Sequence, residues 1–271
     1  SKYNASCHVH MRSKGTDTGL NIHTAVHEVI ALSAISGAPG HIVHIQSTGN
    51  LVTPRLIQMV ADAKKRDVDV TCEVYPYTAG MTDIKSAIFD AGWQERASIT
   101  YNNLQWVATG ERLTKATFEK YRKQGGKVIV HANPESLVRQ VVASPHTIIA
   151  SDGFMGHPRN SGCYSRILGK YVRENRDLSL MVALKKCALW PAQRLEKCAP
   201  AFKKKGRLQV GADADIIIFD ASKIIDKATF KDAAQFSTGI QYTLVHGEPV
   251  VKNGKFQKNI FPGQAARGII R

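Results

Sequence analysis

Short apolar runs alternate with longer amphipathic segments along the first part of the chain. The short runs are rich in β-branched residues and break at polar residues, so they predict strands. They lie at 5–12, 41–45, 69–77, 127–131 and 147–150. The intervening segments place apolar residues at helical spacing and predict helices over 17–36, 53–65, 115–123 and 135–142.

This alternation of strands and helices predicts an α/β fold with parallel strands. Its period of about 30 to 40 residues is typical of a βα barrel. An eight-stranded barrel is not complete here, because only about five strands are predicted. Residues 80–110 predict a long irregular loop on the active side. Helices follow at 178–189 and 192–196, separated by Pro191, because proline interrupts a helix interior.

The pattern changes after Lys205 to short strands and turns. The predicted strands lie at 206–208, 214–220, 242–247 and 249–254. We therefore expect two units. The first, over 1–200, is the barrel portion, and the second, over 201–271, is a small β-domain with a C-terminal tail.

Composition argues against a membrane protein, a disulfide-rich secreted protein and a nucleic-acid-binding protein. The chain has 271 residues, 43% of them hydrophobic, and no apolar run long enough to predict a membrane span. Its five cysteines form no Cys-x-x-Cys motif or disulfide pattern, which favours a reducing, cytoplasmic compartment. The net charge of +15 would suit an acidic partner. However, the basic residues are dispersed apart from Lys203–Lys205, without a nucleic-acid-binding motif, so nucleic acid is not the expected partner.

Three candidate metal ligands follow predicted strands: His10, His44 and Asp152. The carboxyl ends of parallel barrel strands meet on one face, and two imidazoles with a carboxylate suit a catalytic Zn²⁺. Arg159 follows seven residues after Asp152 and is a candidate for anion binding. The same residues also fit an ordinary Ser-Asp-Gly turn and hydrogen-bonded structural histidines. Their wide separation in sequence leaves these alternatives open.

Longer strings resemble the N-acyl-D-amino-acid deacylase (D-aminoacylase) family of the amidohydrolase superfamily. The strings include His10-Met11-Arg12, Val43-His44, Tyr75-Pro76-Tyr77-Thr78-Ala79-Gly80, Ser151-Asp152-Gly153 and His157-Pro158-Arg159. Others continue the order at 168–174, 191–195, 206–215 and 228–230. The resemblance runs from about residue 3 to the end. It implies the C-terminal part of a metal-dependent (β/α)8 hydrolase barrel, followed by a small β-sandwich-like domain.

The resemblance also implies roles for individual residues. His10 and His44 match the family's barrel histidines that hold zinc, as one or two ions. Asp152 matches the carboxylate that contacts the metal site and acts as general base and then general acid. Tyr75 and Arg159 match residues that hold the substrate carboxylate. The implied reaction is zinc-dependent hydrolysis of the amide bond of a small-molecule N-acyl-D-amino acid or a related compound.

The sequence departs from the family pattern in three ways. The His-x-His pair and bridging cysteine of the family's first half have no counterpart, and we expect a separate N-terminal chain, from a split gene or a cleaved precursor, to supply them. Gln46 stands where the family has a lysine, and Met81 stands where it has a serine. These two changes leave a larger N-acyl compound or a D-residue-containing peptide open as substrate.

Two other functions are compatible with the sequence. The chain could be a non-catalytic or regulatory half-subunit, although His10, His44 and Asp152 are all retained. Ser1 could also be an N-terminal nucleophile, with its own amine as the base. Sensitivity to a chelator separates the zinc hydrolase from both alternatives.

Overall fold

A four-stranded parallel sheet forms the centre of the computed structural model, which describes residues 5–12 and 22–268. Its strand order is β1-β2-β3-β7, and every pairing is parallel. The strands are β1 (Cys7–Val9), β2 (Gly40–Ile42), β3 (Val70–Val74) and β7 (Thr147–Ile149). Four of the five predicted strand runs therefore belong to the predicted parallel sheet. The run 41–45 was predicted too long, because Ile45 already begins a helix.

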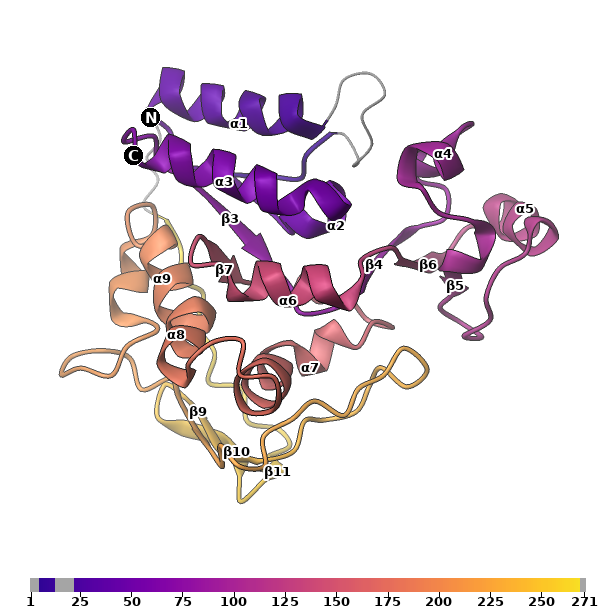
Figure 1. The fold of residues 1–271 in the computed structure, drawn as a ribbon. Coiled ribbons are helices and arrows are strands. Elements are labelled where there is room, and N and C mark those ends of the chain that lie inside the picture. The colour runs from indigo at the N-terminus through magenta and orange to yellow at the C-terminus, as the bar shows by residue number, and fades with distance from the viewer. Residues whose placement is uncertain (1–4, 13–21, 269–271) are drawn as a thin grey trace.

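Helices cover one face of this sheet, as Figure 1 shows for those stacked beside β3. They are α1 (Ile22–Ser36), α2 (Ile45–Gly49), α3 (Thr53–Lys64) and α6 (Glu135–Ala143). Helix α3, within the predicted range 53–65, begins with a proline in its first turn, a position that needs no amide hydrogen-bond donor. The start of the predicted helix 17–36 lies partly outside the described residues.

The two faces of the parallel sheet differ in chemistry because side chains alternate along a strand. Val70, Cys72 and Val74 are fully buried beneath the helices. On the opposite face His8, His41 and Thr71 align in register across three strands. Within the described part of the chain, β1 and β7 each pair on one side only. Each of these two strands therefore has one edge with no paired strand among the described residues.

An insert between β3 and β7 forms a second, antiparallel sheet of order β4-β6-β5, at the right of Figure 1. Its elements are β4 (Ala79–Asp83), η2 (Ala87–Phe89), α4 (Trp93–Ala97), η3 (Tyr101–Asn103), β5 (Leu104–Trp106), α5 (Lys115–Gln124) and β6 (Lys127–His131). The prediction of an irregular loop over 80–110 was wrong, since this segment has its own aromatic core. The strand 127–131 was predicted with correct bounds but in the wrong sheet, because an apolar run does not identify its partner strand.

The connection to the C-terminal sheet is a series of helical segments. They are α7 (Arg159–Arg166), η4 (Ile167–Glu174), α8 (Leu180–Leu184), η5 (Lys185–Leu189), α9 (Trp190–Leu195) and η6 (Pro200–Lys204). The predicted break at Pro191 was wrong. The chain stays helical through this proline, because η5 runs directly into α9 and Pro191 lies in the first turn of α9.

The C-terminal sheet is antiparallel, with order β11-β10-β9-β8. Its strands are β8 (Ile216–Phe219), β9 (Ile240–Val245), β10 (Glu248–Lys252) and β11 (Lys255–Phe256). No strand forms at 206–208, so that prediction was wrong. Ile224 is buried in the core of the parallel sheet, and Phe219 and Ile240 pack against that core, so the C-terminal unit is packed on the barrel portion.

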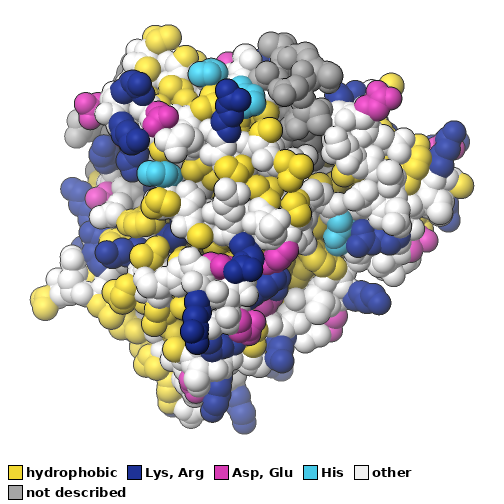
Figure 2. Space-filling view, viewed as in Figure 1, with side chains coloured by type: hydrophobic (Ala, Val, Ile, Leu, Met, Phe, Trp, Pro, Cys, Tyr) yellow, Lys and Arg dark blue, Asp and Glu magenta, His cyan; other side chains and the backbone are white. Residues whose placement is uncertain are grey.

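Surface chemistry agrees with the dispersed charge of the sequence. Figure 2 shows Lys and Arg side chains scattered across the visible face, with Asp and Glu between them. Among the described helices, none is long and apolar enough to cross a membrane.

Candidate active site

One cavity of about 460 Å³ gathers most of the predicted site residues. His10 follows β1, His44 lies between β2 and α2, and Asp152 follows β7. All three line the cavity together with Arg159. This gathering follows from the parallel sheet, because the carboxyl ends of its strands lie at the same edge.

The two histidines face each other closely. Nδ1 of His10 lies 3.0 Å from Nε2 of His44, and the rings meet edge-on with centroids 4.6 Å apart. His44 is buried, and burial lowers its imidazole pKa, which the nearby Asp152 raises by less. The ring is therefore neutral near pH 7, the state in which an imidazole binds a metal.

The nitrogen separation tests whether this pair fits a zinc ion. Zn–N bonds of 2.0–2.1 Å in a tetrahedral site place two ligand nitrogens about 3.3 Å apart. The observed 3.0 Å is close to that value, so His10 and His44 fit two positions of a zinc site. No group of three His, Cys, Asp or Glu residues close enough to hold a metal occurs among the described residues. The structure thus brings the two histidines together, but Asp152 does not lie close enough to form a three-residue metal-binding group with them.

Asp152 is held by an ion pair instead. Its Oδ2 lies 2.7 Å from Nη1 of Arg159, and about a third of the Asp152 side chain is exposed. Both Asp152 and His44 have left-handed backbone, with φ of 46° and 33°. Such conformations are uncommon for residues other than glycine and gather at functional sites. The strain at both positions supports a role in chemistry for this end of the sheet.

Arg159 is a buried cation with capacity for another anion. Its side chain is only 3% exposed, and its guanidinium lies 4.7 Å from the centroid of the Tyr75 ring. Among the described residues, neither Nε nor Nη1 of Arg159 has a hydrogen-bond partner, although Nη1 lies within ion-pair distance of Asp152. A buried guanidinium normally satisfies its donors, so this group is suited to a second carboxylate bound through parallel hydrogen bonds.

Tyr75 is not among the residues that line the cavity. The side chain is fully buried, which raises the pKa of its phenol, and its hydroxyl is next to Ser47 and Arg159. A Cβ atom on Gly80 would lie 3.1 Å from this hydroxyl oxygen, so glycine leaves room for it. The Tyr75 ring therefore packs against the Arg159 guanidinium, and its position is fixed by burial.

The structure shows where the two side chains lie that differ from the family pattern, Gln46 and Met81. Gln46 is fully buried, and its Nε2 donates to the Tyr75 carbonyl at 3.1 Å, so this side chain turns away from the cavity. Met81 lines the cavity from the insert, where an apolar side chain replaces a hydroxyl. The pocket wall nearest the histidines consequently lacks a cation at position 46.

The insert supplies cavity residues that the sequence did not indicate. Lys127 Nζ lies 3.5 Å from the Asp83 carboxylate and 5.1 Å from the centroid of the Phe154 ring. Asp83 and Lys127 are paired in register between β4 and β6. This antiparallel pairing joins residues 44 positions apart, and no local pattern in the chain marks it.

A slightly larger cavity, of about 500 Å³, lies elsewhere. It includes Asp69 and Thr147, at the amino ends of β3 and β7, and Arg194 from α9. None of the histidine pair, Asp152 or Arg159 lines it. The histidine pair and the two residues with left-handed backbone, His44 and Asp152, line the cavity at the carboxyl ends instead, which makes that cavity the candidate site. Ser1, the alternative nucleophile, lies outside the described residues.

Comparisons with known sequences give one consistent result. The sequence pattern of the Amidohydrolase family matches residues 22–251. The D-aminoacylase of Alcaligenes xylosoxydans xylosoxydans is 29% identical, over 96% of this chain and 54% of that relative. The N-acyl-D-glutamate deacylase of the same organism is 28% identical, over 88% of this chain and 50% of that relative. The chain spans about half the length of the curated relatives it matches.

Solved structures confirm the fold class. The N-acyl-D-glutamate deacylase of Bordetella bronchiseptica, solved with zinc and a phosphonate inhibitor, superposes with a TM-score of 0.81 at 26% identity. That match covers 98% of this chain and 56% of the deacylase. A D-aminoacylase with a binuclear metal centre superposes with a TM-score of 0.76 at 23% identity, over 93% of this chain and 54% of that one. The predicted amidohydrolase barrel portion with a small β-domain is therefore correct, while the boundary at residue 200 stays a prediction.

Proposed function

The chain belongs to the amidohydrolase family, and we propose that its complete protein is a zinc-dependent hydrolase that removes the acyl group from N-acyl-D-amino acids. One observation supports this most directly. The His10–His44 nitrogen pair and the Asp152–Arg159 ion pair line the same cavity. A site for a metal, a proton acceptor and a carboxylate clamp are the three parts that this reaction requires.

His10 and His44 would hold the zinc ion through Nδ1 and Nε2, the two atoms that lie 3.0 Å apart. When bound, zinc supplies Lewis-acid activation of the amide. The matching N-acyl-D-glutamate deacylase structure, solved with zinc, supports this choice of metal. One ion or two would fit the proposal equally.

Asp152 would move the proton. Its carboxylate accepts a proton from the attacking water and returns it to the nitrogen of the leaving amine. The side chain lines the cavity and is about a third exposed, with its Oδ2 held 2.7 Å from Arg159 Nη1, so the carboxylate is within reach of water and substrate there. A carboxylate in this position serves as base and then as acid within one turnover.

Arg159 would bind the α-carboxylate of the substrate, with its guanidinium packed against the Tyr75 ring. Its unpaired Nε and its burial favour this role over a purely structural one. The matched relatives named as D-aminoacylase and N-acyl-D-glutamate deacylase act on substrates of this class. The changes at Gln46 and Met81 leave a larger N-acyl compound or a D-residue-containing peptide as the alternative substrate.

The remainder of the barrel would come from a separate N-terminal chain, from a split gene or a cleaved precursor. Two observations support the need for further polypeptide. The inner face of the sheet is polar, and within the described residues β1 and β7 each have one unpaired edge. Native mass spectrometry of the protein purified from its source tests this proposal. A complex with a second chain is the expected result, and a single longer polypeptide would contradict it.

The proposed activity is tested by measuring amine release from N-acetyl-D-amino acids before and after chelation. Turnover that disappears with the chelator and returns with zinc is expected. The non-catalytic half-subunit predicts no turnover in either condition. A nucleophile at Ser1 predicts turnover that the chelator does not change.

A further inference from the structure

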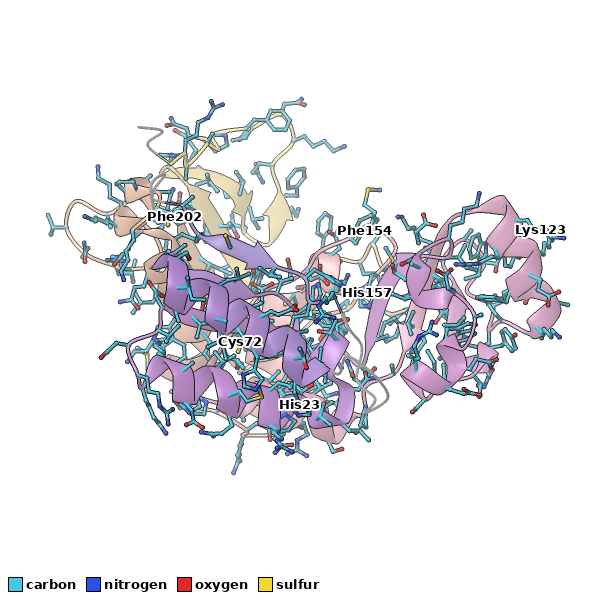
Figure 3. The ribbon with its side chains drawn as sticks, turned by 90° about the horizontal axis from the view of Figure 1, so that it is seen from above. His23, Cys72, Lys123, Phe154, His157 and Phe202 are labelled. Atoms are coloured by element: carbon cyan, nitrogen blue, oxygen red, sulfur yellow. The ribbon has the colours of Figure 1, made fainter. Side chains whose placement is uncertain are left out.

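His157 is a buried imidazole outside the group of residues assigned to the reaction. It lies in the loop between Asp152 and Arg159 and is fully buried. In Figure 3 its label stands beside that of Phe154, where the insert joins the body of the molecule. A buried, titratable side chain this close to the proposed carboxylate clamp needs a physical explanation.

Both ring nitrogens of His157 are engaged. Nδ1 accepts a hydrogen bond from the backbone N–H of Arg159 at 3.1 Å. Nε2 donates to the carbonyl of Ala79, the first residue of β4, at 3.0 Å. These two contacts require the neutral tautomer with its proton on Nε2. The imidazole thus joins the insert to the residue that begins α7.

The ring plane is fixed by its aromatic neighbours. Tyr77 and Phe230 meet His157 edge-on, at centroid distances of 5.6 Å and 5.1 Å. The Tyr77 hydroxyl lies 3.3 Å from the Pro158 carbonyl and 3.2 Å from Oδ2 of Asp226. The backbone on both sides of the Pro158–Arg159 bond is therefore attached to buried, well-packed groups.

Burial keeps the imidazole neutral. Desolvation, followed by the charge of Arg159, lowers the pKa of His157 to about 3, while the Ala79 hydrogen bond raises it by less. The nearby His131 lowers it further. Nδ1 therefore keeps its lone pair for the Arg159 amide throughout the neutral pH range.

We propose that His157 is a positioning residue that fixes the Arg159 guanidinium for the substrate carboxylate; this inference rests on the proposed function. The guanidinium is held at its far end by the Asp152 ion pair and along its face by the Tyr75 ring. His157 fixes the near end, the backbone from which the Arg159 side chain departs. All three contacts together define where the unpaired Nε points.

Two substitutions separate the contacts of His157. His157→Asn retains an acceptor near the position of Nδ1, and His157→Gln retains a donor near the position of Nε2. If the Arg159 contact positions the clamp, H157Q raises KM for N-acetyl-D-alanine about 3- to 10-fold, the value of one hydrogen bond. The turnover number kcat changes little, and H157N stays near the wild-type KM.

A substrate without the carboxylate is the matched control. With N-acetyl-D-alanine amide, all three proteins should have the same kcat/KM, because Arg159 no longer contributes. In an Arg159→Ala background, H157Q should add nothing to the KM for the carboxylate substrate. Equal effects on acid and amide, or equal defects in H157N and H157Q, would show a merely structural helix cap and overturn the inference.

Binding measurements keep this test independent of turnover. An inactive wild-type protein would count against the proposed function alone. Calorimetric binding of N-acetyl-D-alanine and its amide to the three metal-free proteins then decides the role of His157. Weaker binding of the acid, but not of the amide, to H157Q is the expected result. Unchanged acid binding by H157Q would refute positioning.

Discussion

Replacing Asp152 by asparagine removes a proton acceptor and leaves the side-chain shape almost unchanged. The backbone at this position is left-handed, with φ of 46°, a conformation that asparagine adopts more readily than most residues. The ion pair with Arg159 is lost, so this buried guanidinium faces a neutral amide, although the Asp152 side chain is already about a third exposed. We therefore expect D152N to fold, with a loss of about 1–3 kcal/mol of unfolding free energy.

The expected effect on catalysis is measured separately from the effect on stability. A positioned general base and acid contributes about 10²- to 10⁴-fold to the rate, which corresponds to about 3–5 kcal/mol of activation free energy. D152N should therefore lower kcat by that factor while its zinc content stays close to wild type and the protein remains folded at the assay temperature. Initial rates of amine release from an N-acetyl-D-amino acid, with metal analysis of the same sample, measure both.

Asp83, which lines the same cavity, offers a matched control. Asp83→Asn removes the same charge from the same cavity, but Asp83 pairs with Lys127 and lies on the insert. This variant should keep nearly the wild-type kcat. If D152N were fully active, or if D83N were equally defective, Asp152 would not be the proton-transfer group.

Three further predictions concern metal, acid and packing. Removing zinc should abolish turnover without unfolding the protein, and adding zinc back should restore it; retained activity in a metal-free sample would contradict the assignment of His10 and His44. Burial lowers the pKa of His157 to about 3 and of His131 to about 4, so their contribution to stability is complete above about pH 6.5 and is lost as the pH falls toward those values. For fully buried His157 this loss is about 1.4 kcal/mol per pH unit, and it is less for partly exposed His131. A urea concentration at the unfolding midpoint that stays constant as the pH is lowered from about 6.5 to about 4.5 would disprove it. Gly126 has φ of 138°, and an added Cβ would lie 2.5 Å from Trp106, so Gly126→Ala should destabilise the insert by about 1–2 kcal/mol, measured as loss of amide-exchange protection in β5 and β6.

The positions of the candidate residues could be predicted because they depend on local patterns. His10, His44 and Asp152 each follow an apolar run, and the runs alternate with helices. Parallel strands connected this way present their carboxyl ends at one edge. The local hydrophobic pattern and the strand direction together therefore predicted that these three residues, separated by 34 and 108 positions, lie close together. In the structure all three line one cavity.

The insert could not be predicted because its structure depends on long-range pairing. Strand β6 has the same apolar pattern as a barrel strand, but it pairs antiparallel with β4, which lies more than 40 residues earlier. The aromatic residues of 89–121 form a core only when that sheet assembles. Lys127 and Asp83 reach the cavity through the same pairing, so neither had a recognisable signal.

The finer geometry of the site also exceeded what sequence patterns contain. A resemblance can assign Asp152 and Arg159 separate roles, but only coordinates place their charged atoms 2.7 Å apart. The two hydrogen bonds of His157 join residues 78 positions apart and two positions apart, and only the second is local. Side-chain networks of this kind depend on rotamers and packing, which periodicity does not determine.

Stereoselective amide hydrolysis is the most direct measure of the proposed function. Amine release should be followed for paired N-acetyl-D- and N-acetyl-L-amino acids, using the complete zinc-loaded protein purified from its source. Faster hydrolysis of the D-series, weakened when the α-carboxylate is blocked as an amide, is the predicted result. Hydrolysis of neither series, or equal rates with acid and amide forms, would contradict the assignment of a zinc-dependent N-acyl-D-amino-acid deacylase with Arg159 as its carboxylate clamp.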